Sequence, residues 1–80
     1  MLNDFPVQQL GDTGAWVIMI QCMLKDIFRD SIEIHIDGDF GEETQNAVMA
    51  LQRSNGITVD GIVGPAETWQ TIIREWWCLK

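Results

Sequence analysis

The sequence predicts an all-α protein, a compact three-helix bundle with two short extended segments and a repeated Asp-Gly turn. Apolar residues recur at helical spacing in three separate stretches. A turn of the form Asp-Gly-x-apolar-Gly precedes the second and the third of these stretches. Because a chain of this size buries only about 60% of its unfolded surface, we expect residues 1–80 to form a single domain.

The first predicted helix follows an arm that contains Pro6 and ends at Leu10-Gly11. Asp12 or Thr13 is expected to cap this helix, since a short oxygen-bearing side chain can accept a backbone N–H bond there. Five apolar residues then recur every three or four positions and fall within an arc of about 100° on the helix. The expected core stripe consists of Val17, Ile20, Leu24, Ile27 and Phe28.

The second predicted helix follows an extended segment and a tight turn. Residues 31–36 alternate isoleucine with polar residues, which indicates an extended segment with one buried face. In the turn, Gly38 is expected to adopt a positive φ, and the Asp37 carboxylate to accept a bond from the backbone two residues on. The helix should begin after Gly41 and end at residues 55–56, and its expected core residues are Ala47, Val48 and Leu51.

The third predicted helix repeats this arrangement. Residues 57–59 form a second short extended segment, a turn begins at Asp60, and Pro65 is expected in the first helical turn. The apolar stripe of this helix is Trp69, Ile72, Ile73 and Trp76. The two turns therefore form an internal repeat, in which we assign a structural role to Gly38, Gly41, Thr44, Gly61, Gly64, Pro65 and Thr68.

Composition excludes several classes of partner. Twelve acidic residues against five basic ones give a net charge of −7, which argues against nucleic acid and against an anionic membrane surface. The apolar run at residues 15–20 is too short to span a bilayer. The N-terminus is acidic where a secretion signal needs positive charge, so we expect synthesis in the cytoplasm or excision from a longer parent.

The sequence offers no set of residues for catalysis. The one histidine, His35, is expected at the surface, so neither a catalytic triad nor a histidine metal cluster can be drawn. The acids at residues 37–43 lack the ligand spacing of a calcium loop. Cys22 and Cys78 are expected to be two buried thiols. We therefore predict no enzymatic activity, no cofactor and no metal site.

Three ordered blocks of residues recur at the spacing of one known family. The first block is Leu10, Gly11, Gly14, Val17, Ile20 and Gln21. The second is Asp37, Gly38, Phe40, Gly41, Thr44, Ala47, Val48, Leu51 and Gln52. The third is Asn55, Gly56, Asp60, Gly61, Val63, Gly64, Pro65, Thr68 and Trp69. Through these blocks, residues 10–74 resemble the peptidoglycan-binding domain type 1 family, the small helical modules of autolysins, amidases and phage endolysins.

The resemblance implies non-catalytic binding of cell-wall peptidoglycan, through its glycan strand or its stem peptide, which holds an attached or associated hydrolase near its substrate. Residues at or beside the two turns are the candidate ligand contacts: Asp37, Phe40, Asp60, Ile62 and Trp69. The alternative is that each of them serves the turns or the core. The stretch from Gly64 to Thr68 is one residue longer than the family usually shows, so we expect an irregular start to the third helix.

A second hypothesis rests on surplus apolar surface, which marks an interface when it stays exposed. The first helix and the C-terminal tail carry more large apolar residues than one core stripe needs, namely Trp16, Met19, Met23, Trp76 and Trp77. The tail either covers this surface or leaves it to a protein partner or a second copy. In the latter case the chain would be a protein-binding module, such as a phage-encoded inhibitor, an assembly factor or a homodimer, without affinity for the wall.

Overall fold

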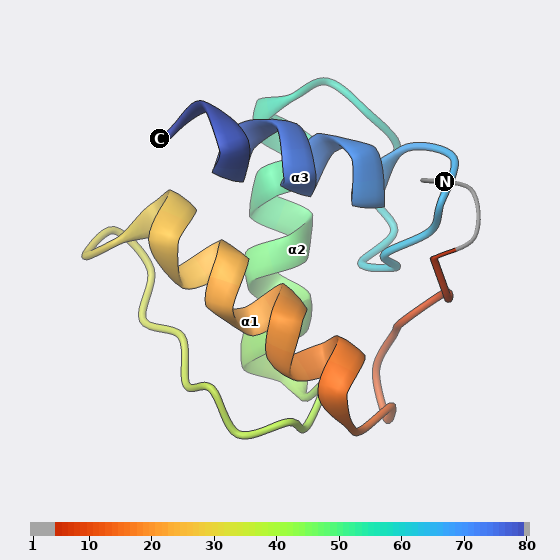
Figure 1. Cartoon of the computed structure of the whole chain (residues 1–80). Helices are drawn as coiled ribbons and strands as arrows, with labels where there is room; N and C mark the ends of the chain where they lie inside the picture. Colours follow the sequence, from red (N-terminus) through yellow and green to blue (C-terminus); the bar gives the residue numbers. More distant parts are fainter. Residues whose placement is uncertain (1–4, 80) are drawn as a thin grey trace.

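The computed structural model describes residues 5–79, which form three helices: α1 (Ala15–Phe28), α2 (Glu42–Ser54) and α3 (Thr68–Cys78). Figure 1 shows α2 behind α1 and α3, whose C-terminal ends lie on the same side of the molecule. Within residues 5–79 there is no strand, and only two isolated antiparallel bridges occur, Gln8 with Val63 and Thr13 with Asp39. The predicted three-helix bundle is confirmed.

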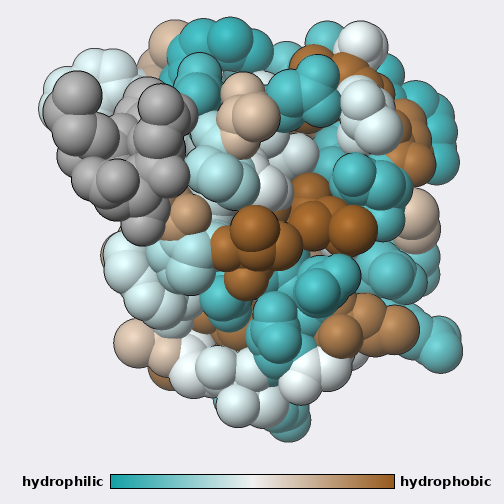
Figure 2. Space-filling view, turned by 90° about the vertical axis from the view of Figure 1, so that its right-hand side faces the viewer, coloured by the Kyte–Doolittle hydropathy of each residue, from teal (hydrophilic) through white to brown (hydrophobic). Residues whose placement is uncertain are grey.

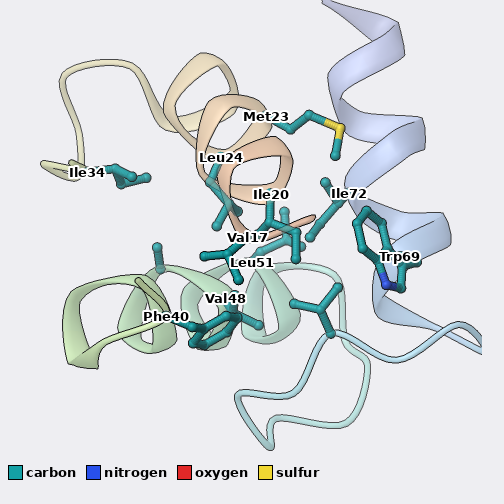
Figure 3. Packing of buried hydrophobic residues seen from close by; sticks show 12 residues of the cluster. Val17, Ile20, Met23, Leu24, Ile34, Phe40, Val48, Leu51, Trp69 and Ile72 are labelled. Carbon is teal, nitrogen blue, oxygen red and sulfur yellow. The ribbon is translucent and has the colours of Figure 1, made fainter. Parts of the chain in front are cut away.

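The hydrophobic core lies where the three helices meet, and both turns contribute to it (Figure 3). Each fully buried large apolar side chain contributes about 1.5–3 kcal/mol relative to an exposed one. The buried members are Val17, Ile20, Met23, Leu24, Ile34, Phe40, Ala47, Val48, Leu51, Val63, Trp69 and Ile72. Of the stripe predicted on α1, only Ile27 and Phe28, in its last turn, are half-buried at the edge of this core.

The predicted side-chain cap of α1 is wrong. The N-cap is Gly14, with φ 115°, and no side chain caps the helix. Asp12 instead accepts a bond from the backbone N–H of Gln9 through Oδ2 at 2.9 Å, and its carbonyl accepts from the N–H of Phe40 at 2.9 Å. The Gly14 N–H donates to the Gly38 carbonyl at 3.0 Å. This segment is therefore fixed by tertiary bonds to the first turn, which compete with a local cap.

The start of α3 differs from the sequence prediction in one respect and matches it in another. Pro65 was expected in the first helical turn, but residues 65–67 form a turn and α3 begins at Thr68. The Trp69 N–H donates to the carbonyl of Gly64, five residues earlier, at 3.0 Å. The additional residue between Gly64 and Thr68 is thus accommodated before the helix, and the predicted irregular start is confirmed.

Two predictions of burial are wrong, one for the cysteines and one for Ile36. Both cysteines, Cys22 and Cys78, are exposed and free, because each lies on a helix face that points away from the core. In the segment before the first turn, Ile34 is buried and Ile32 half-buried, whereas Ile36 is exposed. No sheet partner holds that segment in register, so the period-2 pattern does not extend to its end.

Candidate functional site

The first corner, residues 37–44, is held by a buried glutamine of α1. The Gln21 Oε1 accepts bonds from the backbone N–H groups of Asp37 at 3.1 Å and Gly38 at 3.0 Å. Its Nε2 lies 3.0 Å from three oxygens, Asp37 Oδ1, Asp39 O and Thr44 Oγ1. Asp37 Oδ1 also accepts the Asp39 N–H at 2.9 Å, as predicted. One amide thus connects α1, the turn and the first turn of α2.

The second corner, residues 60–68, repeats the same bonds around a glutamine of α2. The Gln52 Oε1 accepts from the backbone N–H groups of Asp60 at 3.1 Å and Gly61 at 3.0 Å. Its Nε2 lies 2.9 Å from Asp60 Oδ1, 3.1 Å from Ile62 O and 3.0 Å from Thr68 Oγ1. Asp60 Oδ1 accepts the Ile62 N–H at 2.9 Å. Each corner therefore contains one Gln–Asp–Thr cluster.

The two Gln–Asp–Thr clusters make the corners rigid. Both glutamines are fully buried, and within residues 5–79 no buried side-chain nitrogen or oxygen lacks a hydrogen-bond partner. A fully satisfied buried polar network specifies one geometry, because any other would leave polar groups unpaired. Sequence reasoning missed this role of Gln21 and Gln52. The available signal was their repeated position, directly after a core residue and ahead of each Asp-Gly turn.

The structure divides the five predicted ligand residues between the two corners and the core. Phe40 and Trp69 are 2% and 0% exposed, so neither ring reaches solvent. Asp37 and Asp60 are exposed but fix their own turns, and Ile62 is half-buried. The backbone N–H of Asp39 and the Gln21 amide lower the pKa of Asp37. The five side chains do not converge on one surface.

The Trp69 indole connects α3 to the N-terminal arm. Its Nε1 donates to the carbonyl of Pro6 at 2.6 Å. The ring meets Phe5 edge-on at a centroid distance of 4.8 Å and Trp16 at 5.7 Å. These contacts fix the arm beside the second corner, where the Gln8–Val63 bridge joins the two backbones.

A shallow hollow lies beside each corner, and the two hollows differ in their linings. The hollow at the first corner has a volume of about 410 Å³ and is lined by Leu10, Gly11, Asp12, Asp39, Phe40, Gly41 and Glu42. The one at the second corner has about 490 Å³ and is lined by Thr58, Asp60, Ile62, Gly64, Pro65, Ala66, Glu67 and Thr68. In Figure 2, which shows the side of the molecule that lies to the right in Figure 1, apolar side chains gather between polar ones.

An ion pair joins the segment before the first corner to α2. The His35 ring Nδ1 lies 3.0 and 2.9 Å from the two carboxylate oxygens of Glu43. The backbone N–H of His35 donates to Glu43 Oε1 at 2.7 Å. Glu43, as bond partner and as charge, raises the pKa of His35, and the His35 bonds lower the pKa of Glu43. His35 is exposed, as predicted. Within residues 5–79 no group of three His, Cys, Asp or Glu side chains is placed to hold a metal ion.

The residues predicted for a partner interface lie in different environments. Met23 is buried between α1 and α3, and Trp76 is half-buried, with its Nε1 donating to Asp26 Oδ2 at 2.9 Å. Trp16, Met19 and Trp77 are exposed, Trp77 to 68%. Trp76, near the end of α3, therefore covers part of α1. Trp16 and Met19 on α1 and Trp77 on α3 stay uncovered. None of the helices in residues 5–79 has the length and hydropathy required to cross a bilayer.

Comparison with known proteins gives the family. A family model described as a putative peptidoglycan binding domain matches residues 13–72 of the 80-residue chain. The chain belongs to this family. The match lies within the resemblance seen in the sequence, residues 10–74, and includes both corners. The peptidoglycan-binding domain is therefore confirmed as the family predicted from the three blocks.

Relatives of this peptidoglycan-binding domain include larger proteins. The chain is 53% identical over 66 residues to the N-acetylmuramoyl-L-alanine amidase CwlM of Mycobacterium tuberculosis, an alignment that covers 81% of this chain and 15% of the amidase. The solved N-terminal domain of SleB has a TM-score of 0.78 at 34% identity, covering 89% of this chain and 93% of that one. The Burkholderia AP3 phage endolysin has a TM-score of 0.75 at 36% identity, covering 86% and 25%. The fold is thus shared with modules of amidases and endolysins.

Proposed function

We propose that this domain binds bacterial peptidoglycan without catalysing a reaction, and that it holds an attached or associated cell-wall hydrolase at its substrate. The family match over residues 13–72 carries this proposal. The chain spans 15% of the amidase and 25% of the endolysin that it resembles, which leaves room for catalytic domains in those proteins. Linking a binding module to an enzyme raises the effective substrate concentration without any new chemistry.

The hollow at the second corner is the proposed contact surface. Ile62 and Pro65 supply an apolar floor, while Asp60 and Glu67 supply polar groups at its rim. Sugar and peptide ligands need this combination in a surface that is already formed before binding. The Gln52 cluster supplies the rigidity, because it fixes both Asp60 and the start of α3. Phe40 and Trp69 support the two corners from within the core.

Cosedimentation with insoluble peptidoglycan sacculi tests this function. The purified chain should pellet with sacculi and be released by soluble peptidoglycan fragments. Ile62→Arg should weaken the binding about tenfold, which corresponds to about 1.4 kcal/mol. Ile36→Arg is the matched control, since Ile36 is exposed and does not line the hollow. A wild-type chain that stays in the supernatant would contradict the proposal.

A protein partner remains the second candidate function, and one observation favours it. Ile18 and Met19 are exposed on α1, and Trp77 is exposed on α3. Exposed apolar groups of this size are typical of surfaces that meet another protein or a second copy. Sedimentation velocity checks the second copy directly. Self-association that Met19→Lys abolishes would support it, and a strictly monomeric chain at all concentrations would exclude the dimer.

A further inference from the structure

A third cavity lies away from both corners, between the C-terminal ends of α1 and α3. Its volume is about 440 Å³, and it is lined by Lys25, Asp26, Arg29, Asp30, Trp76 and Leu79. In Figure 1 these two helix ends lie side by side at the left of the molecule. None of its lining residues belongs to either Gln–Asp–Thr cluster, so the corners do not explain this arrangement.

The charges around this cavity differ from those of the rest of the chain. The chain carries −7, but the cavity contributes two cations, Lys25 and Arg29, and two carboxylates, Asp26 and Asp30, for a formal sum of zero. Lys80 lies outside residues 5–79, so the cavity has two of the four basic residues that the structure describes. In this part of the chain no ion pair within 4.0 Å joins either cation to a carboxylate. Both signs of charge therefore remain available to a ligand.

One wall of the cavity is an oriented indole. The Trp76 Nε1 donates to Asp26 Oδ2 at 2.9 Å, which fixes the ring, and Leu79 extends the apolar wall. The Lys25 Nζ donates to the Ile34 carbonyl at 3.3 Å, so its stem is held while the ammonium retains donors for another acceptor. A ligand with a short aliphatic body and charged groups at its ends would match this wall and rim.

Arg29 occupies its place at the cavity at the expense of backbone strain. It caps α1 with φ 51° and ψ −115°, and within residues 5–79 it alone has a positive φ without being glycine. Glycine adopts such a φ freely, whereas other residues are strained by it. The strain presents a guanidinium at the rim, and a guanidinium binds a carboxylate through two parallel bonds.

We propose that this cavity binds a zwitterionic segment of the peptidoglycan stem peptide, with a ligand carboxylate at Lys25 and Arg29 and a ligand ammonium at Asp30. The proposal rests on the peptidoglycan binding proposed above and names the part of the polymer that the domain recognises. An N-acetylated glycan strand is neutral and would leave these four charges unpaired. A phosphate group would gain the two cations but meet both carboxylates. A stem peptide with a diamino acid offers carboxylates and a free amine within a few bonds.

A titration of the ¹⁵N-labelled chain with synthetic L-alanyl-γ-D-glutamyl-meso-diaminopimelate tests the site. We expect a saturable shift of the Trp76 indole N–H signal, whereas the signal of the buried Trp69 should remain unchanged. Two matched probes separate the charges. Acetylating the side-chain amine of the tripeptide, or amidating its carboxylates, should each weaken binding about tenfold.

Arg29→Gly is the decisive variant, because it removes the cation while relieving the strain. Its midpoint of thermal unfolding should equal or exceed that of the wild type, and its affinity for the tripeptide should fall about tenfold. Arg53→Gln is the matched control, since Arg53 is exposed on α2 and does not line the cavity. Unchanged affinity in Arg29→Gly, or binding of the acetylated or the amidated probe as tight as that of the unmodified tripeptide, would overturn the proposal.

Sacculus binding separates this inference from the function on which it rests. A chain that pellets with sacculi but shows no shift of Trp76 with the tripeptide retains its function and refutes the site. A chain that fails to pellet refutes the function. Retained sacculus binding by Ile62→Arg together with loss in Arg29→Gly would place recognition wholly in this cavity.

Discussion

The two corners of the molecule have the same cluster and different helix starts. Asp37 and Thr44 are seven residues apart, whereas Asp60 and Thr68 are eight apart. The first corner leads directly into α2 at Glu42, but the second needs the turn at residues 65–67 before α3 begins. Corresponding bonds of the two glutamines nevertheless agree within 0.1 Å, for example 3.0 Å to each threonine hydroxyl. The cluster therefore sets the geometry, and the chain between Asp and Thr adapts to it.

This comparison shows which positions tolerate change. An added residue outside the cluster alters only where the helix begins, because the threonine returns to the same amide. A change within the cluster removes bonds that no neighbouring group replaces.

Replacing either glutamine should give the largest loss of stability, and the losses at the two corners should be similar. Gln21→Leu and Gln52→Leu each leave an aspartate, a threonine and two backbone N–H groups without their amide partner. We expect each to lower the free energy of unfolding by about 3 kcal/mol or more. Urea denaturation followed by tryptophan fluorescence measures this. A large loss at one corner and none at the other would show that the clusters are not equivalent.

The glycines of the two turns should differ in sensitivity. An added Cβ at Gly61, φ 71°, would lie 2.8 Å from Gln45 Cγ, whereas one at Gly38, φ 79°, would meet its nearest neighbour, Ile18 Cγ1, at 3.4 Å. Both alanine variants have the strain of a positive φ, and Gly61→Ala adds a steric overlap. We expect a loss of about 1–2 kcal/mol in Gly38→Ala and about 1 kcal/mol more in Gly61→Ala.

The same denaturation experiment has an internal control at the second corner. Gly64 has no neighbour within 4 Å of an added Cβ and no positive φ. Gly64→Ala should therefore change the free energy of unfolding by no more than about 0.5 kcal/mol. Equal losses in Gly38→Ala and Gly61→Ala would show that Gln45 moves aside.

The smallest effect is a dependence of stability on pH. It should occur at the first corner alone, because the position of the second corner that corresponds to His35 is Thr58. The pKa of His35 is raised above its usual 6.5. Its contribution to the stability of the fold is therefore complete below pH 6.5 and declines as pH rises through the raised pKa. The pKa of Glu43 lies below its usual 4.5, so its contribution is lost as pH falls through that lowered value. The pair should therefore stabilise the fold most between pH 4.5, the usual pKa of Glu43, and pH 6.5, the usual pKa of His35.

An NMR titration of the imidazole signals checks this sign. Glu43→Gln should return the pKa of His35 toward 6.5, although Glu33, 3.8 Å from Nε2, still raises it slightly. The stability difference between wild type and Glu43→Gln should shrink above the pKa of His35. Glu42→Gln serves as the control, and an equal effect from it would indicate general charge repulsion instead of the specific pair.

The sequence predicts those parts of the fold that depend on local pattern. Helical spacing identified the buried aliphatic positions of α2 and most of those of α1, although Met23 was assigned to a partner interface. The repeated Asp-Gly turns identified Gly41 as the residue before α2. The start of α1 could not be predicted in this way, because Asp12 is used for bonds to the arm and to the first corner. A local capping signal does not show that the Asp12 side chain will bind the preceding arm, or that the backbone of this segment will pair with a distant turn.

The candidate site was less predictable than the fold. Family blocks located both corners, but burial decides the role of a side chain there, and Phe40 and Trp69 are in the core. The cavity at the ends of α1 and α3 depends on residues 50 positions apart, such as Asp26 and Trp76. Spacing along the chain gives no indication of such a pair. The exposed thiol of Cys22 shows the converse, that a typically buried residue type can lie outside.

The bond from the Trp69 indole to the Pro6 carbonyl affects the order of events during translation. Its partners are separated by 63 residues, and the Gln8–Val63 bridge spans nearly as much of the chain. Residues 6–8 cannot reach their final position on the growing polypeptide until the beginning of α3 has left the ribosome. Until then Phe5 and Trp16 lack the Trp69 ring against which both pack, and this apolar surface stays exposed.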